Sequence, residues 1–128
     1  MALSMATDER LKRLADNVAR LVAEILVTEL KQPLPAVVTV TGAELSRDMQ
    51  VARVYYTALG EPGQISAAAR QLDRVSSFIQ RELSRRLHLR VTPALNFVHD
   101  KNREQGDRVL KLLADLKRDD RDPGDDST

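Results

Sequence analysis

The sequence contains no cysteine and no tryptophan, and its only aromatic side chains are two tyrosines and two phenylalanines. Without cysteine there is neither a disulfide framework nor a thiolate metal site, and a reducing compartment is favoured, so we expect a cytoplasmic protein. The longest apolar stretch, residues 18–30, is interrupted by Arg20, Glu24 and Glu29. It falls short of the roughly 20 apolar residues that span a bilayer, and no membrane association or secretion signal is expected.

Enzyme motifs are also scarce. The glycines are scattered and form neither a dinucleotide fingerprint nor a phosphate-binding loop. His88 and His99 have no neighbours at metal-ligand spacing, so no metal or other cofactor is expected. Ser76 and Ser77 have no adjacent base, which favours a structural role over a nucleophilic one. We therefore expect a protein without catalytic activity.

The 128 residues are 42% apolar and 30% charged, which is typical of a single folded domain. We assign residues 1–118 to that domain and residues 119–128 to a disordered acidic tail. The net charge is +1, but residues 115–128 carry −3 and the rest therefore carries +4. This asymmetry leaves a positive body that could meet an anionic partner.

Apolar periodicity predicts the first elements of the fold. Residues 8–30 have apolar side chains at three- and four-residue spacing, which predicts an amphipathic helix with Thr7 as its N-cap. Residues 36–45 and 51–59 alternate in polarity and contain many β-branched side chains, which predicts two strands. Residues 46–50 form the turn between them, where Asp48 is assigned to turn chemistry. The two strands are expected to form a hairpin.

A helical region is predicted from Ile65 to about Leu89, with most of its apolar side chains on one side. Phe78 lies about 100° to 140° from that side on a helical wheel, and an unbroken helix would project it into water. Because burying an aromatic ring is favourable, we predict two helices joined by a kink at Ser76 and Ser77. The alternative is one continuous helix with an exposed Phe78.

Residues 94–100 follow Pro93 and are predicted to form a third strand. Residues 104–116 are rich in leucine and fit a last amphipathic helix, which we expect to cover the core of its own domain. Part of that helix could instead dock on a partner protein. The resulting order, α, β, β, α, α, β and a final helix, predicts an α+β fold with one small sheet packed on helices.

Arginine is the residue type that bears most on function. Six arginines lie between residues 70 and 90, where the only acidic residues are Asp73 and Glu82. The six are Arg70, Arg74, Arg81, Arg85, Arg86 and Arg90. Four of them fall within about 60° on a helical wheel, opposite the apolar side. A solvated helix face is the simplest interpretation, but the shortage of carboxylates favours guanidinium groups that bind phosphates. With so few aromatic side chains, RNA would be recognised by its backbone and shape.

Several blocks of this sequence resemble the ribosome-binding factor A family. The similar blocks are LADNVARLVAEILVTEL, VTVTGAELSRDMQVARVYYTALG, FIQRELSRRLHLRVTPALNFVHD and DKNREQGDRVLKLLADL. The resemblance covers roughly residues 8–116 and implies a type II KH domain of the order α-β-β-α-kink-α-β. The family has a helix-kink-helix with an Ala-x-Gly interruption, which falls here on Val75, Ser76 and Ser77 and lacks the glycine.

The resemblance implies a factor that binds the free small (30S) ribosomal subunit and its 16S ribosomal RNA. It further implies help with late maturation and 5′-end processing of that RNA, a role in cold adaptation, and assembly GTPases as functional partners. We expect a monomer in which the six arginines clamp phosphates while the kink at Ser76 and Ser77 lets the backbone approach the RNA. A small nuclease acting on ribosomal RNA, and a protein-interaction domain using the last helix, are the alternatives.

Overall fold

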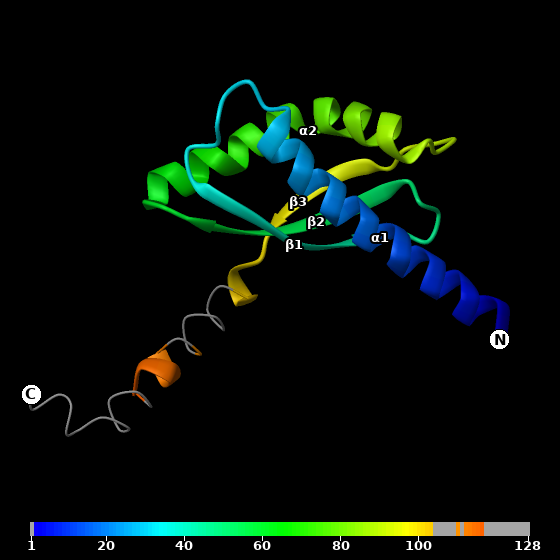
Figure 1. Ribbon diagram of the computed structural model, residues 1–128, viewed down its shortest axis with the longest axis horizontal. Helices are drawn as coiled ribbons and strands as arrows, with labels where there is room; N and C mark the ends of the chain where they lie inside the picture. Colours follow the sequence, from blue (N-terminus) through cyan, green and yellow to red (C-terminus); the bar gives the residue numbers. More distant parts are fainter. Residues whose placement is uncertain (1, 104–109, 111, 117–128) are drawn as a thin grey trace, which may run out of the picture.

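The computed structural model describes residues 2–103, 110 and 112–116. Its elements are α1 (Ala2–Thr28), β1 (Val37–Leu45), β2 (Val51–Leu59), α2 (Pro62–Leu87) and β3 (Ala94–His99). The three strands form one sheet in the order β1-β2-β3, and both helices lie on the same face of it (Figure 1). The predicted α+β class is therefore confirmed.

Helix α1 begins earlier than the sequence pattern indicated. It starts at Ala2, so Thr7 lies inside the helix and the prediction that Thr7 is the N-cap is wrong. The first residues, ALSMA, include strong helix formers and neither glycine nor proline, so nothing stops the helix before them. Its inward face follows the prediction, because Val18, Val22 and Ile25 are completely buried.

The hairpin is confirmed, with β1 and β2 antiparallel and their register shifted at a bulge between Val40 and Gly42. In its turn the Ser46 hydroxyl donates to Asp48 Oδ1 at 2.7 Å, and the Gln50 N–H donates to the same oxygen at 3.1 Å. These two bonds hold the pKa of the Asp48 carboxyl below its usual value, with the Ser46 bond the larger cause. Asp48 thus has the turn role assigned to it from the sequence.

Helix α2 is one continuous helix, and the prediction of two helices joined at Ser76 and Ser77 is wrong. It begins at Pro62, a residue type suited to the first helical position, and the Glu61 N–H donates to Gln64 Oε1 at 2.9 Å. It ends where His88 adopts the left-handed conformation, with φ of 53°.

Phe78 explains why the predicted break is unnecessary. The side chain is half-buried in the unbroken helix and packs against the core cluster that α1 and the sheet share. Residues 29–32, which follow α1, border the same space as Phe78 and Val75. The core covers one side of the ring in the unbroken helix, so the helix does not have to change phase to bury it partly.

Strand β3 lies parallel to β2, in register from Val51 opposite Ala94 to Tyr56 opposite His99. Alternate side chains of β2 face the helices, where Ala52, Val54, Tyr56 and Ala58 are buried. From α2, Leu72, Ile79 and Leu83 meet them and are completely buried. The core therefore lies between the sheet and the helices, and α2 turns its other side outward.

The predicted last helix falls partly outside the described residues, as do the tail at 119–128 and the boundary assigned at residue 118. Residues 110 and 112–116 are helical. Their leucines are exposed, with 66% of Leu110, 63% of Leu112, 54% of Leu113 and 59% of Leu116 accessible. Figure 1 shows this segment leading away from the sheet. The expectation that these leucines cover the core is wrong, because the core is already closed by α1 and α2.

Candidate nucleic-acid interface

The outward side of α2 carries the arginine row predicted from the sequence. Arg70, Arg74, Arg81 and Arg85 are all exposed and belong to one unbroken helix. At 100° per residue they fall within about 60° of one another, opposite the buried Leu72 and Leu83. We call these four residues the arginine row. Since the helix is continuous, their relative directions follow directly from their positions in the sequence.

Most of the arginine row has no ion-pair partner among the described residues. Within the part of the chain that the structure describes, Arg70, Arg74 and Arg81 form no ion pair. Arg85 Nη1 lies 3.2 Å from Glu82 Oε1, but 78% of the arginine side chain remains exposed. Such an exposed pair is weak and can rearrange toward a phosphate. The row therefore presents positive charge that the described residues barely neutralise.

Arg86 points elsewhere. Its guanidinium bridges two carboxylates of the α1 region, lying 3.2 Å from Glu29 Oε1 and 3.6 Å from Glu24 Oε2, and only 30% of the side chain is exposed. The sequence prediction counted Arg86 among the phosphate-binding residues because Asp73 and Glu82 were the only nearby acids. The structure brings two further acids, Glu24 of α1 and Glu29 directly after it, so Arg86 links α2 to the end of α1.

Arg90 is separated from the row by the end of the helix. The His88 N–H donates to Ser84 O at 3.0 Å where α2 ends, and Arg90 follows as an exposed residue in the connection to β3. It lies beyond the helical register that aligns the other four arginines.

The three residues assigned to a kink have separate environments. Val75 is half-buried and packs against the core. The Ser76 hydroxyl donates to Asp73 O at 2.9 Å, within the same helix, and is half-buried. Ser77 is exposed, on the side of the helix that carries the arginine row. The backbone at these positions is engaged in the helix, so the expected close approach of backbone to RNA at a kink is not available.

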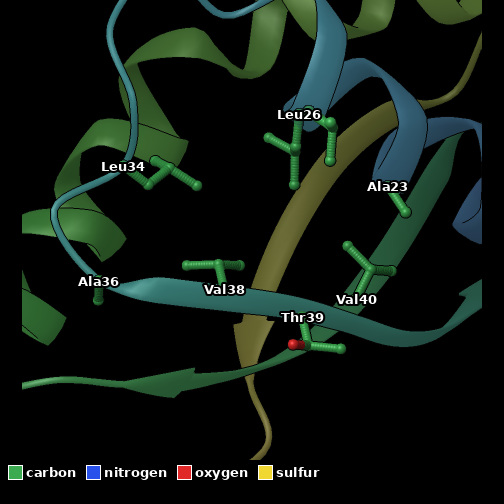
Figure 2. Close-up of a pocket in the computed structure, with 8 residues that line it drawn as sticks. Ala23, Leu26, Leu34, Ala36, Val38, Thr39 and Val40 are labelled. Atoms are coloured by element: carbon green, nitrogen blue, oxygen red, sulfur yellow. The ribbon is translucent and has the colours of Figure 1, made fainter.

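Two hollows lie near the C-terminal end of α1, and their linings differ in chemistry. One, of about 310 Å³, lies between α1 and β1 and is lined almost entirely by apolar side chains, including Leu26, Leu34 and Val38 (Figure 2). The other, of about 430 Å³, lies between residues 29–32 and α2 and contains Arg74 from the arginine row. Only the second brings positive charge to a concave surface. Lys31 and Gln71 also line this second hollow, and neither of them was identified from the sequence. The only sequence signal for a contact here was Phe78, which lies away from the apolar side of its helix.

Features of a metal enzyme do not assemble among the described residues. No group of three or more His, Asp or Glu side chains there could hold a metal ion. The His99 ring stacks on Tyr56, with centroids 5.2 Å apart. His88 is used at the C-terminal end of α2. None of the helices in the described segments is long and apolar enough to span a membrane.

Comparisons with known proteins agree with this architecture. Residues 10–113 match the family model described as ribosome-binding factor A. The chain is 40% identical over 119 residues to ribosome-binding factor A of Thioalkalivibrio sulfidiphilus, covering 91% of this chain and 92% of that protein. It is 41% identical over 117 residues to that of Acinetobacter baylyi, covering 85% and 88%.

Solved structures give the same relationship. The crystal structure of ribosome-binding factor A from Thermus thermophilus superposes with a TM-score of 0.61 at 29% identity, covering 70% of this chain and 93% of that one. A homology model of the Thermus thermophilus protein, fitted into a cryo-EM map of its complex with the 30S subunit, gives a TM-score of 0.54 at 32% identity, covering 65% of this chain and 87% of that one. The α+β arrangement is accordingly the KH-like one that the sequence resemblance implied. From the matched family model and the extent of these similarities, the chain belongs to the ribosome-binding factor A family.

Proposed function

We propose that this protein binds the free 30S ribosomal subunit in the cytoplasm, as a monomer, and holds 16S ribosomal RNA against the outward side of α2. It acts by binding and not by catalysis, assisting late maturation and 5′-end processing of that RNA. The observation that carries the proposal is the exposed arginine row, of which Arg70, Arg74 and Arg81 have no ion pair within the described residues. Family membership supports it, as does the relative that was fitted into a 30S complex.

The chemistry of the row suits an RNA backbone. Each guanidinium offers a planar fork of N–H donors that matches a phosphate, and the charge is available without first breaking a buried pair. The exposed Ser77 hydroxyl, on the same side of α2, adds a neutral donor. Contacts of this kind fix the position of RNA by its backbone and shape. Holding a helix or junction in place matters most in the cold, when misfolded RNA rearranges slowly.

Charge reversal on α2 tests this proposal. We expect R74E/R81E/R85E to abolish cosedimentation with immature 30S particles while the fold persists, because exposed charges contribute little to stability. The matched control is R10E/K12E/R13E, which makes the same charge change at three exposed positions of α1 and should retain binding. Equal losses in both variants would point to net charge alone, and retained binding in the α2 variant would refute the assignment of the row.

Salt dependence is an independent test of the same contacts. If about four or five phosphates are neutralised, the association constant should fall by about 100-fold or more between 50 and 200 mM salt. Sedimentation with immature and mature subunits at both concentrations measures this fall and any preference for the immature particle. An association that does not change with salt would contradict a phosphate-binding mechanism.

The exposed leucines favour a second function, which is docking on a partner protein such as an assembly GTPase. Leu110, Leu112, Leu113 and Leu116 lie on a short helical segment and are more than half exposed, so they offer an apolar face to a groove. Deleting residues 106–128 should leave folding and RNA binding intact and remove only the protein contact. A loss of folding would instead place this segment in the core.

A further inference from the structure

The hollow between the end of α1 and the middle of α2 has two walls. One comes from α2 and contains Phe78 and Val75, and the other comes from the residues that follow α1 and contains Leu30. Phe78 and Val75 are half-buried, so each packs against the core on one side and borders the hollow on the other. The volume of about 430 Å³ lies within the range of about 300 to 1,000 Å³ that small ligands occupy in proteins. The hollow therefore offers a partly aromatic surface at the edge of the arginine row.

Its rim is positively charged. Arg74 lies one helical turn before Phe78 and thus on the same side of α2, while Lys31 faces it from the opposite wall. Both side chains are exposed, and neither forms an ion pair within the described segments. The one acidic residue at the rim is Glu29, whose carboxylate is already bound by Arg86 at 3.2 Å. An anion entering here would meet two unpaired cations and one neutralised acid.

The walls are held together by contacts between distant parts of the chain. The Gln71 amide of α2 donates to Gln32 O at 3.1 Å, and Arg86 ties the end of α1 to α2. The same Gln71 side chain keeps a carbonyl oxygen as an acceptor and a second N–H as a donor. Polar groups of this kind can bond to the edge of a heterocycle. The hollow is thus formed before any ligand arrives.

We propose that this hollow takes one unstacked nucleotide of the bound RNA, with the base against Phe78 and its phosphate between Arg74 and Lys31. The inference rests on the proposed binding of RNA by the arginine row and adds to it a site for a single base. Aromatic contact, paired cations and an amide are the groups with which proteins hold splayed-out nucleotides, whereas a regular RNA helix would span the opening without entering it. The site gives the protein a means of distinguishing RNA that has an unpaired base at this place.

Removing the aromatic ring tests the base contact. Phe78→Leu keeps an apolar side chain against the core, and we expect association of the full chain with immature 30S particles to weaken by about 5- to 100-fold, the cost of losing one stacked base. The matched control is Phe97→Leu, which removes a ring that packs on the same core from β3 but does not line the hollow. Thermal unfolding monitors the stability of both variants. Equal binding by the two would overturn the proposal.

Crosslinking locates the nucleotide. Because the chain has no cysteine, Gln32→Cys introduces a single thiol at the hollow, which can be labelled with an aryl azide. Illumination of the labelled protein on immature 30S particles should yield crosslinks concentrated at one nucleotide. The control is Val27→Cys on α1, where the native side chain is 85% exposed and borders the apolar hollow instead.

The possible failures are distinguishable. If the Gln32→Cys protein cosediments but gives no concentrated crosslink, or gives the same pattern as the control, the nucleotide site is wrong and the arginine row stands. If the unaltered protein does not associate with the subunit, the proposed function itself fails. A concentrated crosslink to a ribosomal protein would likewise overturn the nucleotide assignment.

Discussion

Arg81 and Arg86 lie five residues apart on the same helix, yet they meet different surroundings. Arg81 is exposed and forms no ion pair within the described residues, while Arg86 is half-buried and bridges Glu24 and Glu29. The five intervening steps turn the second side chain away from solvent and toward α1. The comparison teaches that an arginine on this helix is available to a partner, or used for internal packing, according to what the opposite element supplies.

The largest contrast between the two sides of α2 is expected in stability. Ile79→Ala should lower the free energy of unfolding by about 2 to 5 kcal/mol, because the side chain is completely buried and its removal leaves a cavity. Arg81→Ala, two residues away on the exposed side, should change it by less than about 0.5 kcal/mol. Urea titration followed by circular dichroism measures both. A similar loss in the two variants would mean that α2 does not divide into an inward and an outward side.

The next contrast separates Arg81 from Arg86 directly. Arg86→Ala should cost about 1 kcal/mol of stability or less, since its ion pairs are partly exposed and screened by solvent. It should leave the salt dependence of subunit binding unchanged. Arg81→Ala should instead reduce the slope of log K against log salt by about one, as expected for one lost phosphate contact. If Arg86→Ala reduced that slope equally, Arg86 would have to leave α1 on binding.

A smaller effect is expected at Ser77, on the outward side. Ser77→Ala should raise stability by about 0.5 kcal/mol, because alanine is the better helix former and the position is exposed. Subunit binding should fall by about 2- to 10-fold, the worth of one hydrogen bond. Unfolding and sedimentation measurements on the same preparation check both. A loss of stability would indicate that the serine is required for a bend in the helix.

The smallest effect lies in the hairpin turn, away from α2. The pKa of Asp48 is lowered in the folded protein by its bonds from Ser46 and Gln50. A depressed pKa stabilises the fold above the usual aspartate value of 3.8 and loses that contribution as the pH falls below it. Asp48→Asn should therefore flatten the decline in stability in acid. The difference between the two proteins should disappear at the lowest pH, and a constant difference would contradict the titration of this group.

The hairpin and the inward face of α1 could be predicted from the sequence because their signals are local. Alternation in β1 and β2, and the recurrence of Val18, Val22 and Ile25, each reflect one element with one buried side. The arginine row was found for the same reason. Its four side chains point to the same side of any continuous helix that contains these positions.

The errors involved contacts between distant segments. The partners of Arg86 lie in α1 and directly after it, at Glu24 and Glu29, which no count of charges near residue 86 includes. Phe78 was expected to force a break, but its ring packs against the core from the unbroken helix and borders the same hollow as residues 29–32. The leucines at 110, 112, 113 and 116 were predicted to be core residues from their spacing, but they are exposed. That spacing does not reveal that α1 and α2 already cover the face of the sheet. Local periodicity predicts which side of a helix or strand is apolar, but it does not predict which segment packs against that side.

The continuity of α2 has a geometric consequence for whatever lies against it. With a rise of about 1.5 Å per residue, Arg70 and Arg85 stand roughly 22 Å apart along a straight rod. Arg74 and Arg81 divide that length into intervals of about 6, 10 and 6 Å. A strand that engages all four must hold its phosphates along a line of that span, so a tightly curled segment engages fewer. The helix therefore fixes the spacing of the four guanidinium groups, and the shape of the RNA backbone determines how many of them bind a phosphate.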